Sequence, residues 1–242
     1  IGEEMMGSGA EVWRAEEAML RMLRAYKELK EVNVWLIASN IQVSVETEEG
    51  EIITQIRFVK MGEANFDRLD YLNHLSRQVC QTTPDAETID RMLEEVMNRP
   101  KQPRWMHYLG GILGGAGFAV FFNCGLVDAL IAVVASVIII NLGEVIEKRE
   151  TNPFRYNAII SFVVETFILL VVVVLGIGDS YNNITLGVVM LLISGLGFTN
   201  GIRGFLNRDV LSGLIILTNA LVGACGIAIG IALPILIMKG VL

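Results

Sequence analysis

The sequence predicts a membrane protein in which an N-terminal cytoplasmic α+β domain is followed by an α-helical bundle of about five transmembrane helices. Residues 1–99 carry 11 Lys and Arg against 19 Asp and Glu, a net charge of −8. Residues 100–242 carry 8 against 7 and hold most of the long apolar runs, several of which reach the roughly 18–20 residues that cross a bilayer. This split disfavours a uniform soluble domain. The overall charge of −7 argues against a nucleic-acid partner, because phosphate binding needs a basic surface.

The chain opens with an amphipathic pattern. Apolar residues recur at helical spacing from Val12 to Tyr26 and predict a helix within residues 8–30. Ser8 is predicted as its N-cap, with Glu11 three residues later as in a capping box.

A hairpin is predicted next. Apolar residues alternate with polar ones at 41–45 and, less strictly, at 53–58, and Glu48–Gly50 lies between the two runs. Asp85 or Thr83 is expected to cap a later helix that has Pro84 near its start. The further elements expected in this domain are a β-prone stretch at 32–38 and helices at 65–80 and 85–98.

A basic stretch with two prolines, residues 98–104, marks the expected domain boundary. The prediction is a cytoplasmic α+β domain at 1–99, a linker at 100–104 and a transmembrane helical domain at 105–242. The expected membrane segments are 105–122, 126–143, 156–176, 184–203 and 210–238.

The basic residues that flank these segments predict their orientation. Lys and Arg concentrate in cytoplasmic loops, and the loops at 123–127 and 177–183 contain neither. We therefore expect a multi-pass protein of the inner membrane with its N-terminal domain in the cytoplasm and its termini on opposite sides. The residues behind this prediction are Lys101, Arg104, Lys148, Arg149, Arg155, Arg203 and Arg208, and Lys239 is the exception.

The sequence contains no recognisable catalytic or metal-binding motif. Its three cysteines are far apart and form no CxxC pair, and its two histidines form no HExxH motif. A GxxxxGK[ST] nucleotide loop is also missing. We therefore expect neither an enzyme nor a bound metal or cofactor. The N-terminus is predicted as an acidic amphipathic helix and not as a secretory signal.

Two carboxylates are predicted inside the membrane domain. Glu165 lies near the middle of segment 156–176, where a charged side chain is costly and is by default functional or paired. Proton coupling and a structural pairing with another polar residue are both open for it. Asp128, near the start of segment 126–143, is a second candidate for coupling, or an acid that the helix dipole favours at that position.

The densest polar stretch of the membrane domain is 194–203, where three glycines and four polar side chains interrupt an apolar segment. This composition is typical of a broken transmembrane helix whose free backbone groups bind a small polar substrate. Arg203 offers planar donors for a carboxylate, although it could also extend to lipid headgroups. The predicted substrate-binding residues are Asn200, Arg203, Thr199, Ser194 and Asn219.

Small residues recur at four-residue spacing in two segments. Such residues let helix backbones approach closely, so helix packing is the main interpretation and a glycine-lined pathway or hinge is the alternative. The GxxxG pairs are formed by Gly110, Gly111, Gly114 and Gly115 in one segment and by Gly226 and Gly230 in the other.

Residues 8–17, 125–128 and 194–213 carry ordered motifs that resemble those of the threonine/serine exporter family. Residues 8–17 are similar to its GAE-x-x-R-x-E opening, and Gly125–Asp128 to its Gly-x-x-Asp motif. Residues 194–213 resemble its PG-x-x-x-x-N-A-x-R-D…D-x-x-S-G signature, with Ser194 in place of the proline and Gly204 in place of the acid. Other matching positions are Thr54, Arg57, Asn65, Phe66 and Leu69, followed by Asn200, Arg203, Asp209, Ser212 and Gly213.

The resemblance implies a subunit of a secondary-active, proton-coupled exporter of a small polar metabolite: threonine, serine or a dicarboxylate such as succinate. Five segments are few for a transporter built from two repeats, so the chain resembles the N-terminal half of a split, two-component member. A small membrane partner protein, or a homo-oligomer, would complete the pathway. From the residues alone, a membrane-anchored sensor or assembly module and a channel subunit also stay open.

Overall fold

The computed structural model describes residues 1–37, 39–59, 64–100, 102–146, 150, 152–207 and 209–238. Its contacts divide the chain into two compact units. The first unit consists of residues 1–101 and 200–216, and the second of the remaining chain from 102 onward. Five residues used to predict the orientation lie outside the described part: Lys101, Lys148, Arg149, Arg208 and Lys239.

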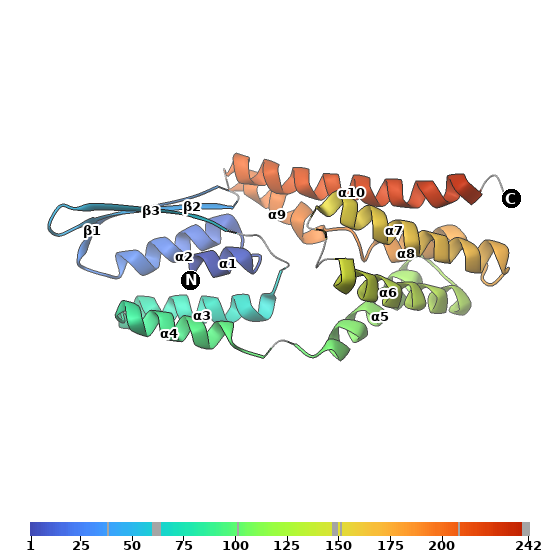
Figure 1. The fold of residues 1–242 in the computed structure, drawn as a ribbon, viewed down its shortest axis with the longest axis horizontal. Helices are drawn as coiled ribbons and strands as arrows, with labels where there is room; N and C mark the ends of the chain where they lie inside the picture. The colour runs from blue at the N-terminus through green and yellow to red at the C-terminus, as the bar shows by residue number, and fades with distance from the viewer. Residues whose placement is uncertain are drawn as a thin grey trace. The chain divides into compact units, whose positions relative to one another are not determined.

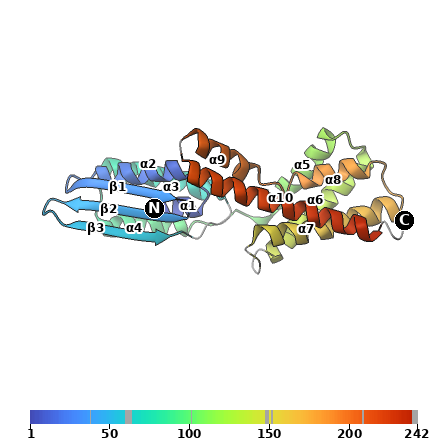
Figure 2. The same cartoon turned by 90° about the horizontal axis from the view of Figure 1, so that it is seen from above.

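The first unit contains an antiparallel sheet in the order β1-β2-β3, with helices on one face (Figure 1 and Figure 2). Helix α2 packs against β1 on one side and α3 on the other, and α3 packs against α4. The elements are α1 (Gly2–Gly7), α2 (Val12–Arg24), β1 (Leu29–Ile37), β2 (Asn40–Thr47), β3 (Ile52–Phe58), α3 (Phe66–Thr82) and α4 (Ala86–Met97).

The apolar stripe of α2 forms the centre of this unit's core. Val12, Ala15, Met19 and Met22 are all buried, as the helical spacing predicts. They pack with apolar residues of α1, the sheet and α3, among them Met5, Met6, Leu36, Ile41, Leu72, Leu75 and Val79.

The start of α2 differs from the prediction. Ser8 does not cap it: Ser8 follows α1, is buried, and its backbone carbonyl accepts a hydrogen bond from the Asn65 amide at 3.0 Å. Gly9 has a φ of +89°, which bends the chain so that α2 begins after Glu11. Asp85 caps α4 by accepting from the Thr88 amide at 3.0 Å. Hydrogen bonding from the Thr88 side chain, and then from its amide, lowers the pKa of Asp85.

The register of the sheet separates the apolar residues of β3. Val43 pairs with Gln55 and Val45 with Ile53, so these side chains share the face toward the helices. Ile56 and Phe58 lie on the opposite face and are 68% and 71% exposed. Because side chains alternate along a strand, Ile53 and Ile56 cannot share a face, which explains why the pattern there is less strict.

The second unit is helical. Helix α6 contacts α5, α7 and α8, and Figure 1 shows these three helices next to it. Apolar side chains from these helices, including Ala119, Ala132, Ile160, Val164 and Ile184, form the core. The elements are α5 (Arg104–Phe121), α6 (Leu126–Ile146), α7 (Pro153–Leu169), a π-helical turn η1 (Leu170–Val174), α8 (Tyr181–Val189), α9 (Gly195–Leu206) and α10 (Val210–Met238); the last two contribute to both units.

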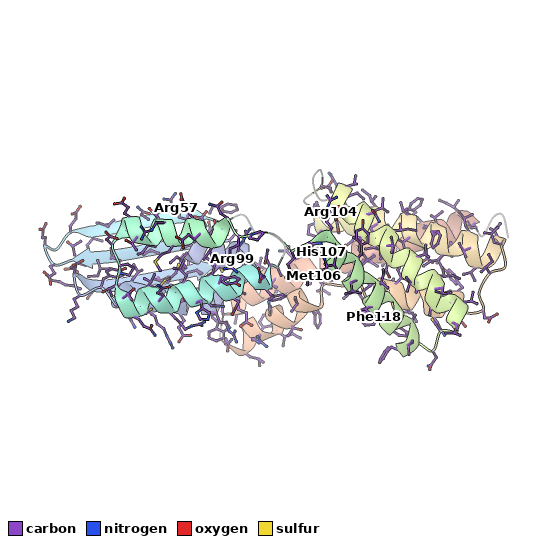
Figure 3. The ribbon with its side chains drawn as sticks, turned by 90° about the horizontal axis from the view of Figure 1, so that it is seen from below. Arg57, Arg99, Arg104, Met106, His107 and Phe118 are labelled. Atoms are coloured by element: carbon purple, nitrogen blue, oxygen red, sulfur yellow. The ribbon has the colours of Figure 1, made fainter. Side chains whose placement is uncertain are left out.

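Three helices among the described residues are long and apolar enough to cross a membrane: α6, α7 with η1 (Pro153–Val174), and α10. Helix α5 has 18 residues but begins with a polar turn that includes Arg104 and His107; both are labelled along α5 in Figure 3. The segment expected at 184–203 is divided into α8 and α9 by a turn at 190–194. The number of five membrane spans remains a prediction.

Glycines allow helices of the second unit to approach closely. A Cβ at Gly115 would lie 2.0 Å from the Ser136 hydroxyl of α6. On α10, a Cβ at Gly226 would lie 2.4 Å from the Phe154 carbonyl, and one at Gly230 would lie 2.5 Å from the Ala158 carbonyl, both on α7. These contacts support the packing interpretation of the GxxxG pairs. Gly110, by contrast, faces open space.

The α7–α10 contact gives a stability prediction. Gly230→Leu should lower the thermal stability of the purified chain in detergent, because the side chain meets rigid backbone and overpacking costs about 1–3 kcal/mol. Gly117→Leu is the matched control, since Gly117 is exposed and a Cβ at this position would have no atom within 4 Å. Equal melting temperatures for the two variants, measured by fluorescence-detected size exclusion after heating, would contradict this packing.

Candidate functional site

Glu165 is buried in the second unit with two hydroxyl partners. It is 2% exposed on α7. The Tyr181 hydroxyl donates to Oε1, and the Thr185 hydroxyl donates to Oε2 at 3.1 Å. Both partners lie on the first half of α8, four residues apart, so they face the same side of that helix. The sequence reasoning missed Tyr181 and Thr185, although their four-residue spacing next to a buried acid was a usable signal.

Asp128 is the second buried carboxylate of this unit. It lies in the first turn of α6, is 2% exposed, and its Oδ1 accepts a hydrogen bond from the Asp179 amide at 2.9 Å. Gly178 has a φ of +104°, and a Cβ there would lie 2.7 Å from Asp128 Oδ1. Only glycine fits this position without strain, for both conformational and steric reasons.

One short segment therefore binds both carboxylates. Residues 178–185 supply the amide that holds Asp128 and the hydroxyls that hold Glu165. The chain reaches this segment from Glu165 through the π-helical turn η1, a form that is frequent at functional sites. We call residues 178–185, with Asp128 and Glu165, the buried carboxylate site.

A different cluster forms in the first unit around Glu11. Its carboxylate accepts from the Trp13 indole N–H at 2.7 Å and lies 3.4 Å from Nε of Arg14. Its Oε1 accepts a hydrogen bond from Nη1 of Arg203, which comes from α9. The Glu11 side chain is 15% exposed and that of Arg203 is 45% exposed. The predicted substrate-binding arginine is thus paired with a carboxylate of this chain, a pairing that the 192-residue separation hid from sequence reasoning.

Four further positions of the signature belong to this region: Gly204, Asp209, Ser212 and Gly213. Asp209 accepts from the Ser212 amide at 3.2 Å at the start of α10. Burial, together with the nearby Asp209 carboxylate, raises the pKa of Glu16. Gly204 approaches Gly213 so closely that a Cβ at 204 would lie 2.8 Å from the Gly213 Cα. This packing accounts for glycine where the family signature has an acid.

The five predicted substrate-binding residues are not joined in one cluster by the described contacts. Asn200 and Arg203 belong to the first unit, whereas Ser194, Thr199 and Asn219 belong to the second. The Thr199 hydroxyl donates to the Gly195 carbonyl at 2.9 Å within α9. Within the part of the chain that the structure describes, the hydrogen bonds connect none of these five side chains to another. The same part contains no group of three or more His, Cys, Asp or Glu that could hold a metal ion.

Comparisons with known proteins agree with the resemblance seen in the sequence. The family model described as "Putative threonine/serine exporter" matches residues 1–238. A protein of Mycobacterium tuberculosis (strain ATCC 25618 / H37Rv) named "Probable threonine/serine exporter" is 22% identical over 237 residues. This alignment covers 97% of the chain and 44% of the relative, so the chain spans less than half of the relative's length. No solved structure matches the chain.

The raised pKa of Glu16 predicts a pH-dependent stability. Because the folded state holds this proton more tightly than the unfolded state, Glu16 costs stability as the pH rises through the window above the ordinary Glu pKa of about 4.3. Glu16→Gln should therefore raise the melting temperature at pH 7, and the gain should vanish below about pH 4.

Thermal unfolding followed by tryptophan fluorescence would measure this, since Trp13 and Trp35 lie in the first unit. Glu17→Gln is the control, because Glu17 is exposed and pairs with Arg21 on its own helix at 2.6 Å. A Glu16→Gln gain that persists undiminished at pH 4 would contradict the assignment.

Proposed function

Since the chain belongs to the threonine/serine exporter family, we propose that it is a subunit of a secondary-active exporter in the inner membrane. Its substrate is a small polar metabolite that carries a carboxylate, with threonine or serine first and a dicarboxylate such as succinate second. The observation that carries the proposal is the buried carboxylate site, in which two acids lie among apolar helices. Ionisable groups at such positions are costly and are typical of ion and substrate pathways.

Glu165 is the proposed proton-binding group, with Asp128 as the second coupling candidate. Its partners, Tyr181 and Thr185, are hydroxyls. A hydroxyl can either donate or accept a hydrogen bond, so it can serve a charged carboxylate and a protonated one in turn. A lysine or arginine partner would instead hold the carboxylate in its charged form. This chemistry favours reversible protonation over a purely structural ion pair.

Arg203 and Asn200 are the proposed partners of the substrate carboxylate. They are three residues apart on α9 and therefore neighbours on one helix surface. The Arg203 guanidinium binds the carboxylate of Glu11, which shows that it can hold a group of this kind. Thr199, Ser194 and Asn219, which belong to the second unit, are the other residues proposed to bind substrate.

The chain is proposed as half of a transport pathway. The relative that it matches is more than twice as long as the matched region, and a split family member would need its remaining segments from a small membrane partner protein. A homo-oligomer is the other way to complete it. In this arrangement residues 1–99 form a cytoplasmic domain and residues 105–242 the membrane domain.

Transport measurements test the site. Arg203→Ala and Glu165→Gln should each reduce efflux of labelled threonine from producing cells by about tenfold or more, because each removes a charged group worth about 1.5–3 kcal/mol in hydrogen bonding. Arg155→Ala and Glu144→Gln are matched controls; these residues form exposed or half-exposed pairs with Glu150 and Arg104, at 3.5 Å each. All variants should reach the membrane in equal amounts.

Efflux at the wild-type rate in both Arg203→Ala and Glu165→Gln would show that the assignment of these residues is wrong. Flux that does not depend on the proton gradient would indicate a channel instead, and a sensor or assembly module would give no flux of threonine, serine or succinate at all.

A further inference from the structure

The carboxylate of Glu11 makes no capping hydrogen bond to the helix that it precedes. Glu11 occupies the N-cap position of α2 with extended backbone angles, φ −64° and ψ 135°. A short polar side chain at this position, such as Asp or Ser, ordinarily accepts a hydrogen bond from an amide of the first helical turn. The Glu11 side chain makes no such bond. It points instead to Trp13, Arg14 and Arg203.

Arg203 can exchange this partner. Its backbone is fixed, because α9 and α10 meet at the glycine pair 204 and 213, which leaves no room for a Cβ. Its side chain remains 45% exposed. A guanidinium has five donors and can hold a carboxylate in a two-pronged arrangement, so a dissolved carboxylate can approach the donors that Glu11 leaves open.

Glu11 can also release Arg203 at low cost. A half-buried carboxylate that loses its only cation would be left as an unpaired charge, which is strongly unfavourable. Here the Trp13 indole N–H, at 2.7 Å, and the Arg14 guanidinium, at 3.4 Å, remain as partners. The cluster is therefore built so that one of its contacts, the one to α9, is separable from the others.

We propose that Glu11 is an internal competitor for the carboxylate-binding position on Arg203. A substrate carboxylate displaces the Glu11 carboxylate, and this frees the start of α2 from α9. The Glu11 carboxylate is tethered near Arg203 at an effective concentration on the order of millimolar, so substrate binds Arg203 more weakly than it would without this competitor. The inference rests on the proposed role of Arg203 in binding substrate and adds to it a regulatory residue in the soluble domain.

Equilibrium binding to the purified full chain in detergent tests the proposal. The probes are radiolabelled L-threonine, L-serine and succinate. Each is titrated to a concentration on the order of 0.1 M, about 100-fold above a millimolar effective concentration of the tethered Glu11 carboxylate. Glu11→Gln keeps the shape of the side chain and removes its charge, so it should tighten binding of the active probe by about three- to tenfold. Glu17→Gln, an exposed acid of the same helix, should bind as wild type does. Arg203→Gln should lose binding.

The outcomes separate the two proposals. Binding by Arg203→Gln equal to wild type overturns the role of Arg203 and the competition with it. Loss of binding in Arg203→Gln with unchanged or weaker binding in Glu11→Gln overturns the competition alone. Binding by Glu11→Gln where wild type binds nothing supports complete competition. If neither wild type nor Glu11→Gln binds any of the three probes, both the inference and the carboxylate role of Arg203 are wrong.

Discussion

A carboxylate buried among apolar helices must be given hydrogen-bond donors, and much of the second unit follows from this requirement. Leaving such a group without partners costs far more than most single contacts contribute. Segment 178–185 meets the requirement twice, with a backbone amide for Asp128 and two hydroxyls for Glu165. The left-handed backbone at Gly178 and the π-helical turn after α7 are the local irregularities that bring this segment into place. The hydrogen bonds of the buried carboxylate site therefore also connect α6, α7 and the segment that begins α8.

The first unit depends on a different carboxylate. Glu11 connects the start of α2 to α9 through Arg203, and nearby the close approach of Gly204 and Gly213 fixes the turn between α9 and α10. The opening motif of the chain and residues 200–213 of its late signature thus belong to the same unit, although 192 residues separate the two paired side chains. This ion pair joins the start of α2 to the helix that carries two of the proposed substrate ligands, Asn200 and Arg203.

Family membership and the physical chemistry of the sites support each other without being the same argument. The match over residues 1–238 shows that the chain belongs to the threonine/serine exporter family. The geometry explains individual glycines: Gly204, within the late signature, because a side chain would strike the Gly213 backbone, and Gly178 because a Cβ would strike Asp128. Such steric reasons are local, so they apply to this chain whatever its relatives carry at the same positions.

The sequence by itself determined the elements whose signal is periodic or compositional. The stripe of α2, the hairpin of β2 and β3, the cap at Asp85 and the long apolar helices α6, α7 and α10 all follow from local spacing and length. The burial of Glu165 was also predictable, because a charged residue within an apolar run is recognisable in the sequence.

Only the tertiary structure decided which groups donate hydrogen bonds to the carboxylates. The partners of Glu165 are 16 and 20 residues away and that of Asp128 is 51 residues away. The capping preference of Ser8 was likewise overridden by the fold: Ser8 ends α1, and the turn at Gly9 separates it from the start of α2. Pairing across such distances is set by packing and by the need to satisfy buried polar groups, neither of which leaves a periodic trace in the sequence.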